Sequence, residues 1–184
     1  QSKSGGQDML NMSVKTELTD LTQVMEKLRS EAFVDKSKMS LFGASQGGVV
    51  ASLYAAAYPD RVHKLMLIFP AFVLFDDAKE TYRELGSPDF DQLPDSLTHH
   101  NATLGKIYLI DALDIDIQAE QAKITAPTLI IHGTDDAVVP YQYAVQASQT
   151  IPNAELVTVE GGEHHIDERF AITAAPAIQK FLKE

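Results

Sequence analysis

The sequence predicts an α/β fold with a mainly parallel sheet. Three short segments, residues 64–69, 128–131 and 155–159, have the length and composition of strands, and the first two are continuously apolar like buried parallel strands. Segments with helical character alternate with them along the chain. This alternation is typical of parallel strands joined by helical connections. At 184 residues the chain is long enough for one domain with a substantial core.

The first long element predicted is an amphipathic helix over residues 13–29. Its apolar residues recur every three or four positions, so they share one face of the helix. They are Val14, Leu18, Leu21, Met25 and Leu28. Asn11 and Ser13 are both candidate N-caps, because their side chains accept hydrogen bonds from the first helical N–H groups. Residues 1–7 are polar and glycine-rich, which predicts a loop.

A strand, a tight turn and a helix are predicted in direct succession. Residues 39–42 are mostly apolar, and the turn GASQGG separates them from the helix-forming residues 49–58. In this context G-x-S-x-G is typical of a nucleophile elbow, in which Ser45 has a strained backbone conformation. We expect glycine at Gly43 and Gly47 because strand and helix nearly touch there. The alternative is a glycine-rich turn in which Ser45 only caps the helix.

Residues 71–123 interrupt the alternation of strands and helices. They contain Pro88, Pro94 and an aspartate-rich run over residues 89–95. The segment is too short for a core of its own, so we interpret it as a lid inserted into a core that spans residues 1–184.

Two more helices are predicted beyond this insertion. Residues 141–150 form the first and residues 166–183 the second. Pro176 lies inside the second, where we expect it to kink the helix or split it in two.

Composition excludes several classes of function. The formal charge of −11 argues against nucleic acid and anionic membrane surfaces as partners. There is no cysteine, so disulfides, thiolate metal sites and a cysteine nucleophile are absent. The longest apolar run, residues 65–75, is too short to cross a bilayer and is broken by Pro70. We expect a cytoplasmic protein, although the chain begins at Gln1 and an upstream segment is expected.

Three chemically active residue types follow predicted strands. Ser45 follows the first strand, Asp135 and Asp136 follow residues 128–131, and a histidine pair ends the segment VEGGEHH after the last strand. A serine hydroxyl is a weak nucleophile until a base removes its proton, and the base needs a carboxylate to orient it. The order serine, aspartate, histidine therefore predicts nucleophilic catalysis at one edge of the sheet.

The motifs also resemble a known family. PTLIIHGTDDAVVP at residues 127–140 and VEGGEHH at residues 159–165 resemble α/β-hydrolase fold serine esterases. LPDSL at residues 93–97 and LGKIYLIDA at residues 104–112 resemble the lid insertion of bacterial feruloyl and cinnamoyl esterases. The resemblance implies a small-molecule ester as substrate and requires no metal or organic cofactor.

The resemblance also selects site residues. The pattern D-x-x-V-P implies Asp136 as the acid, and G-x-x-H implies His164 rather than His165 as the base. The backbone N–H of Gln46 would be one oxyanion donor. Tyr108, by its position in the lid motif, is implicated in substrate contact, with a plain core position as the alternative.

The same resemblance exposes a gap. QSKSGG at residues 1–6 resembles the end of a loop of this family. In the family, several strands come before that loop, so the fold is expected to be N-terminally truncated. The elbow strand would then lie at an open sheet edge, which invites pairing with another chain. A missing N-terminal segment or a homo-oligomer is expected to complete the sheet.

Alternative functions remain beside the esterase. A thioesterase, a lysophospholipase and a monoacylglycerol lipase would share the same residues, and a truncated relative would act as a non-catalytic interaction module. The remaining histidines are assigned no catalytic role. His132 is interpreted as structural, and His99 and His100 have no carboxylate at metal-ligand spacing.

Overall fold

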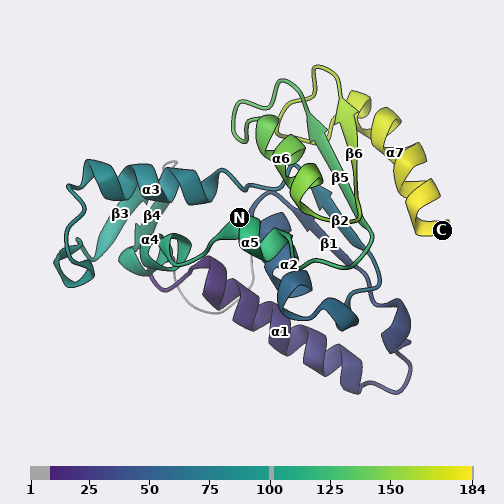
Figure 1. The fold of residues 1–184 in the computed structure, drawn as a ribbon, viewed down its shortest axis with the longest axis horizontal. Coiled ribbons are helices and arrows are strands. Elements are labelled where there is room, and N and C mark those ends of the chain that lie inside the picture. Colours follow the sequence, from purple (N-terminus) through teal and green to yellow (C-terminus); the bar gives the residue numbers. More distant parts are fainter. Residues whose placement is uncertain (1–8, 100–101, 184) are drawn as a thin grey trace.

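The computed structural model describes residues 9–99 and 102–183 and shows a four-stranded parallel sheet (Figure 1). The strands are β1 (Leu41–Ala44), β2 (Leu65–Ile68), β5 (Thr128–Gly133) and β6 (Ala154–Val159), in the order β1-β2-β5-β6. Each neighbouring pair is parallel. The predicted fold class is confirmed. The loop expected at residues 1–7 and the side chain of His100 lie outside the described residues.

Two apolar cores lie on the two faces of this sheet. The larger contains residues of α1 (Val14–Ser30), α2 (Gln46–Ala57) and α6 (Gln142–Thr150). The smaller lies under α7 (Glu168–Lys183). The alternation of side chains along a strand explains the division, because Ile130 of β5 belongs to the larger core and Leu129 and Ile131 to the smaller.

Helix boundaries follow local chemistry. Ser13 is the N-cap of α1, where its side chain accepts from the N–H of Thr16 in a capping box; of the two candidate caps, Ser13 takes this role rather than Asn11. Pro176 lies inside α7, which remains one helix, so of the two expected outcomes, a kink or a division, the division does not occur. Short 3₁₀ turns occupy Lys36–Lys38 and Pro59–Arg61.

Most of the segment between β2 and β5 lies to one side of the sheet, whereas its last helix packs against α2 and α6 (Figure 1). It contains α3 (Leu74–Glu84), a 3₁₀ turn (Phe90–Gln92), α4 (Lys106–Leu113) and α5 (Ile117–Gln121). It also contains an antiparallel pair, β3 (Ser96–His99) and β4 (Ala102–Gly105), that the sequence did not predict.

Within this segment α4 packs against α3, and α4 also packs against α1 of the core. Its role as a lid stays a prediction. None of the helices in the described part of the chain combines the length and apolar character that crossing a membrane requires.

Candidate active site

Ser45 occupies a sharp turn between β1 and α2. Its φ of 52° and ψ of −127° lie in a region that side-chain-bearing residues rarely adopt. Backbone hydrogen bonds hold it there: its N–H donates to the carbonyl of Ile68 (3.0 Å), and its carbonyl accepts from Ala71 (3.0 Å). The Ser45 side chain makes no capping hydrogen bond, which removes the reading of this serine as a mere helix cap.

The glycines around the turn have unequal roles. A Cβ on Gly43 would meet the carbonyl oxygen of Gly47 at 2.4 Å and the Cα of Gly48 at 2.7 Å, so strand and helix do touch there. A Cβ on Gly47 would meet nothing within 4 Å, so the steric reason expected for that glycine is wrong. Gly48 is the second tight position, with the Pro70 side chain at 3.0 Å.

His164 connects Ser45 to Asp136. Its Nε2 lies 3.0 Å from the Ser45 Oγ, and its Nδ1 lies 2.7 Å from an Asp136 carboxylate oxygen. Phe69 packs against the imidazole, with ring centroids 4.5 Å apart. The structure therefore brings together Ser45, His164 and Asp136, three residues separated by up to 119 positions, in the arrangement of a nucleophile, a base and an orienting acid.

The Asp136 carboxylate is fully buried and surrounded by donors. One oxygen accepts from the backbone N–H groups of Val138 (2.9 Å) and Val139 (2.8 Å). The other lies near His164 Nδ1 (2.7 Å) and also 3.1 Å from the Nε2 of His132. A buried carboxylate requires such partners, because desolvation otherwise disfavours its charged form.

His132 is fully buried at the end of β5. Its Nε2 lies 2.9 Å from the carbonyl oxygen of Val139, which can only accept, so this nitrogen carries the proton. Its Nδ1 is buried without a partner among the described residues. Burial lowers the pKa of His132, although the nearby Asp136 carboxylate opposes this, and the ring is held neutral.

The residue after the nucleophile links two other elements. The Gln46 carboxamide donates to the Glu17 carboxylate of α1 (2.6 Å) and accepts from the Tyr108 hydroxyl of α4 (3.0 Å). Burial raises the pKa of Glu17, while the bond from Gln46 opposes the increase. Burial also raises the pKa of Tyr108 to about 12, so its hydroxyl stays a donor. Gln46 begins α2, where backbone N–H groups lack helical acceptors.

A cleft of about 220 Å³ opens beside Ser45. It is lined mainly by apolar side chains, including Met12 and Leu74, and its polar groups beside Ser45 are Gln46, Asp77 and Tyr108. Tyr108 lines the cleft that contains Ser45, and its contact with substrate stays a prediction.

The competing candidates lie apart from this arrangement. The Asp135 side chain accepts from the Thr134 hydroxyl (3.1 Å), and its N–H donates to the carbonyl of Gly162 (3.0 Å). The His165 side chain is 57% exposed and lies near Glu163 and Asp167 at 3.8 and 4.0 Å. Neither contacts Ser45.

Sequence reasoning missed the supporting contacts of Phe69 and Glu17. His132 is fully buried, as its interpretation as a structural residue expects, but its proximity to Asp136 was not predicted. The one local signal in the sequence was that Phe69 directly precedes Pro70, and in the structure its φ of 35° is unusual for this residue type. The contacts of Glu17 and His132 depend on tertiary structure.

The fold and this arrangement together define an α/β-hydrolase. The sequence profile of the prolyl oligopeptidase family matches residues 8–184, so the chain belongs to that family. The resemblance to α/β-hydrolase fold esterases is confirmed.

Among solved structures, the chain is similar to the ferulic acid-bound Est1E from Butyrivibrio proteoclasticus. The two are 28% identical with a TM-score of 0.83, and the match covers 100% of this chain and 74% of that one. A monoacylglycerol lipase from Paleococcus ferrophilus, at 20% identity and a TM-score of 0.65, covers 93% of this chain and 75% of that one and shares the fold.

Sequence relatives match over shorter parts. The AB hydrolase superfamily protein YisY of Bacillus subtilis is 29% identical over 157 residues, which cover 67% of this chain and 59% of that protein. RutD of Stutzerimonas stutzeri is 39% identical over 70 residues, which cover 38% of this chain and 26% of RutD. The chain thus spans less than two thirds of the length of either relative.

Proposed function

We propose that this chain carries the catalytic centre of a serine hydrolase that cleaves carboxylic esters through an acyl-enzyme. The observation that carries the proposal is the continuous contact from the Ser45 Oγ through the His164 imidazole to the Asp136 carboxylate. The family, the relatives and the strained serine turn support the same chemistry.

In the acylation step, Ser45 Oγ attacks the ester carbonyl while His164 Nε2 takes the hydroxyl proton. Collapse of the tetrahedral intermediate breaks the bond to the alcohol, and the imidazolium returns its proton to that leaving oxygen. Asp136 holds Nδ1 and stabilises the imidazolium. Water then attacks the acyl-enzyme with His164 again as base, which releases the acid and restores Ser45.

The negative charge of the tetrahedral intermediate needs preorganised donors. The backbone N–H of Gln46 supplies one, at the N-terminus of α2 where the helix dipole adds to the stabilisation. Loss of one such donor typically costs about 3 kcal/mol of transition-state stabilisation. The second donor is not identified among the described residues.

For the substrate, we propose hydroxycinnamoyl esters. The cleft beside Ser45 has mainly apolar walls with the Tyr108 hydroxyl and the Asp77 carboxylate among its polar groups, a combination that suits an aromatic acyl chain with a phenolic end. The similar Est1E structure is described as ferulic acid-bound, and the match includes the whole chain. A monoacylglycerol lipase activity is the second candidate. The fold shared with the Paleococcus lipase and the mainly apolar cleft of this chain support it.

A fluorophosphonate probe tests the catalytic proposal. We expect covalent labelling of Ser45 that disappears in Ser45→Ala and weakens strongly in His164→Ala. His165→Ala is the matched control, since its side chain lies outside the site, and its labelling should equal that of the original chain. A folded sample that resists labelling would overturn the enzyme proposal and favour a non-catalytic interaction module.

A substrate panel tests the finer proposal. We expect methyl ferulate to be cleaved faster than a short aliphatic p-nitrophenyl ester and faster than a long-chain monoacylglycerol. If the monoacylglycerol ranks first, the lipase candidate replaces the feruloyl one. A preference for the short aliphatic ester leaves only a general esterase.

A further inference from the structure

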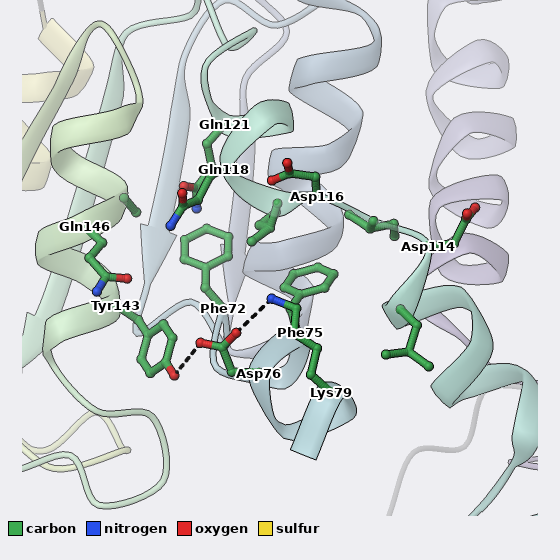
Figure 2. Close-up of a pocket in the computed structure, with 14 residues that line it drawn as sticks. Phe72, Phe75, Asp76, Lys79, Asp114, Asp116, Gln118, Gln121, Tyr143 and Gln146 are labelled. Carbon is green, nitrogen blue, oxygen red and sulfur yellow. Dashed lines mark hydrogen bonds and ion pairs between the residues drawn. The ribbon is translucent and has the colours of Figure 1, made fainter. Parts of the chain in front are cut away.

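A second cavity, of about 510 Å³, is shown in Figure 2. The helix α3 lines both this cavity and the Ser45 cleft, with different residues. Leu74 and Asp77 of this helix line the Ser45 cleft, whereas Phe75, Asp76 and Lys79 line the second cavity. The two cavities have no lining residue in common. The second cavity lies between α3, α5 and α6, and its volume is within the range of small-molecule sites.

The deepest polar group of this cavity is the Gln121 carboxamide. Gln121 is only 3% exposed, and no hydrogen bond joins its side chain to the described residues. A carboxamide offers two donors and two acceptor sites, and here these face the solvent inside the cavity. Gln121 lines the cavity, so a molecule inside the cavity is the partner within reach.

Two more carboxamides stand at the rim. Gln118 enters from α5, as Gln121 does, and Gln146 enters from α6, as Figure 2 shows. Both are exposed, and neither side chain forms a hydrogen bond with the described residues. Three unengaged amide groups from two helices therefore converge on one space.

The charged groups of the cavity are already engaged. Asp76 accepts from Lys79 (3.0 Å) and from the Tyr143 hydroxyl (3.0 Å), the contacts drawn in Figure 2. Asp114 pairs with Lys15 at 2.6 Å. Asp116 accepts from the N–H of Ala119 (3.1 Å) as the cap of α5, so the groups that remain to bind a ligand are neutral.

Charge and shape restrict the ligand further. The three carboxylates Asp76, Asp114 and Asp116 outnumber the single ammonium of Lys79 in the lining, so the cavity repels anions. The partly exposed apolar side chains of the lining are those of Leu113, Ile115 and Ile117, whereas Phe72 and Phe75 are almost fully buried behind it. A ligand that combines many hydroxyl groups, no charge and apolar C–H faces matches this lining.

We propose that this cavity is a binding site for a neutral carbohydrate of one or two sugar rings. Its hydroxyl groups exchange hydrogen bonds with the carboxamides of Gln118, Gln121 and Gln146, and a C–H face lies against the apolar side chains that line the cavity. The site does not depend on the proposed esterase chemistry, because it has no residue in common with the Ser45 cleft.

Saturation-transfer difference NMR with xylobiose and cellobiose tests the proposal on the full chain. We expect saturation transfer to at least one disaccharide and an unchanged signal in Ser45→Ala, which separates this site from the esterase chemistry. In Gln121→Leu, which keeps the volume and removes the amide, we expect affinity to fall about tenfold, the usual effect of one lost hydrogen bond.

Two further variants guard against a folding artefact. Gln146→Ala changes an exposed rim position and should weaken binding while leaving the melting temperature unchanged. Gln23→Leu, the same class of change on the exposed face of α1, should leave binding unaffected. Absence of transfer to both disaccharides, equal binding by Gln121→Leu and Gln146→Ala, or preferred binding of glucuronic acid would each overturn the proposal.

Discussion

The Nε2 of His132 lies 3.1 Å from the same Asp136 oxygen that His164 contacts at 2.7 Å. Asp136 therefore lies between two imidazoles, of which one faces Ser45 and the other is fully buried. The buried ring cannot reach the nucleophile, so its effect passes through the carboxylate. We interpret His132 as a positioning residue.

Replacing His132 tests this interpretation. His132→Leu removes the imidazole whose Nε2 lies 3.1 Å from Asp136 and whose N–H donates to the Val139 carbonyl, so we expect the free energy of unfolding to fall by about 1–3 kcal/mol together with a loss in kcat. His132→Gln retains an N–H donor at this position and should restore part of both. Thermal unfolding and steady-state kinetics measure the two effects. A Leu variant that loses stability but keeps full kcat would reduce His132 to a structural role.

A comparison of the two adjacent aspartates tests the identity of the acid. Asp136→Asn turns an amide toward His164 and favours the wrong tautomer, so kcat should fall about 10⁴-fold. Asp135→Asn should leave kcat nearly unchanged, because Asp135 bonds to Thr134 rather than to a histidine. The reverse ranking in ester hydrolysis assays would transfer the role to Asp135.

These two predictions also show what the sequence could supply. Ser45, Asp136 and His164 were predictable because each lies in a short local motif after a strand, and parallel strands end at one edge of the sheet. His132 was not, because its contact with Asp136 requires the loop after β5 to fold back until Val139 meets the imidazole.

The connection between β2 and β5 was the least predictable part of the fold. Its β3–β4 pair consists of four-residue strands with mixed polarity, and such strands carry little periodic signal. The prediction of a close contact at Gly47 was wrong for a different reason. The motif requires a small residue on average, whereas in this turn the space beside Gly47 is open and Gly43 and Gly48 make the close approaches.

The half-buried carboxyl of Glu17 predicts a pH-dependent stability. Burial raises its pKa above the ordinary value of 4.5, so the folded state holds this proton more tightly than the unfolded state. The contribution of Glu17 to the free energy of unfolding is therefore fully present below pH 4.5. It is lost as the pH rises through the raised pKa of the folded state.

Glu17→Gln removes that dependence, because the amide never ionises yet its oxygen can still accept from Gln46. We expect the variant to be more stable than the original chain near neutral pH and the difference to vanish in acid. Chemical unfolding across pH measures this, with the exposed Glu80→Gln as control. A constant difference at every pH would show that the Glu17 pKa is not raised.

The outer edge of β1 predicts association. Among the described strands, β1 pairs only with β2. The backbone N–H groups of Leu41 and Ser45 donate toward β2. Because successive N–H groups of a strand alternate in direction, the N–H groups of Phe42 and Ala44 point to the outer edge. The Phe42 side chain is 58% exposed. We propose that another strand, from a second copy or a preceding segment, covers this edge.

For the 184-residue chain alone, sedimentation velocity should therefore show a dimer or larger species that grows with concentration. Phe42→Lys places a charge on the edge and should shift the population toward monomer, because a buried ammonium opposes strand pairing. Ile172→Lys, at an exposed apolar position on α7, is the matched control and should leave the distribution unchanged. A monomer at every concentration, with β1 amide protons protected from exchange to the same degree as those of β5, would mean that this edge needs no partner strand.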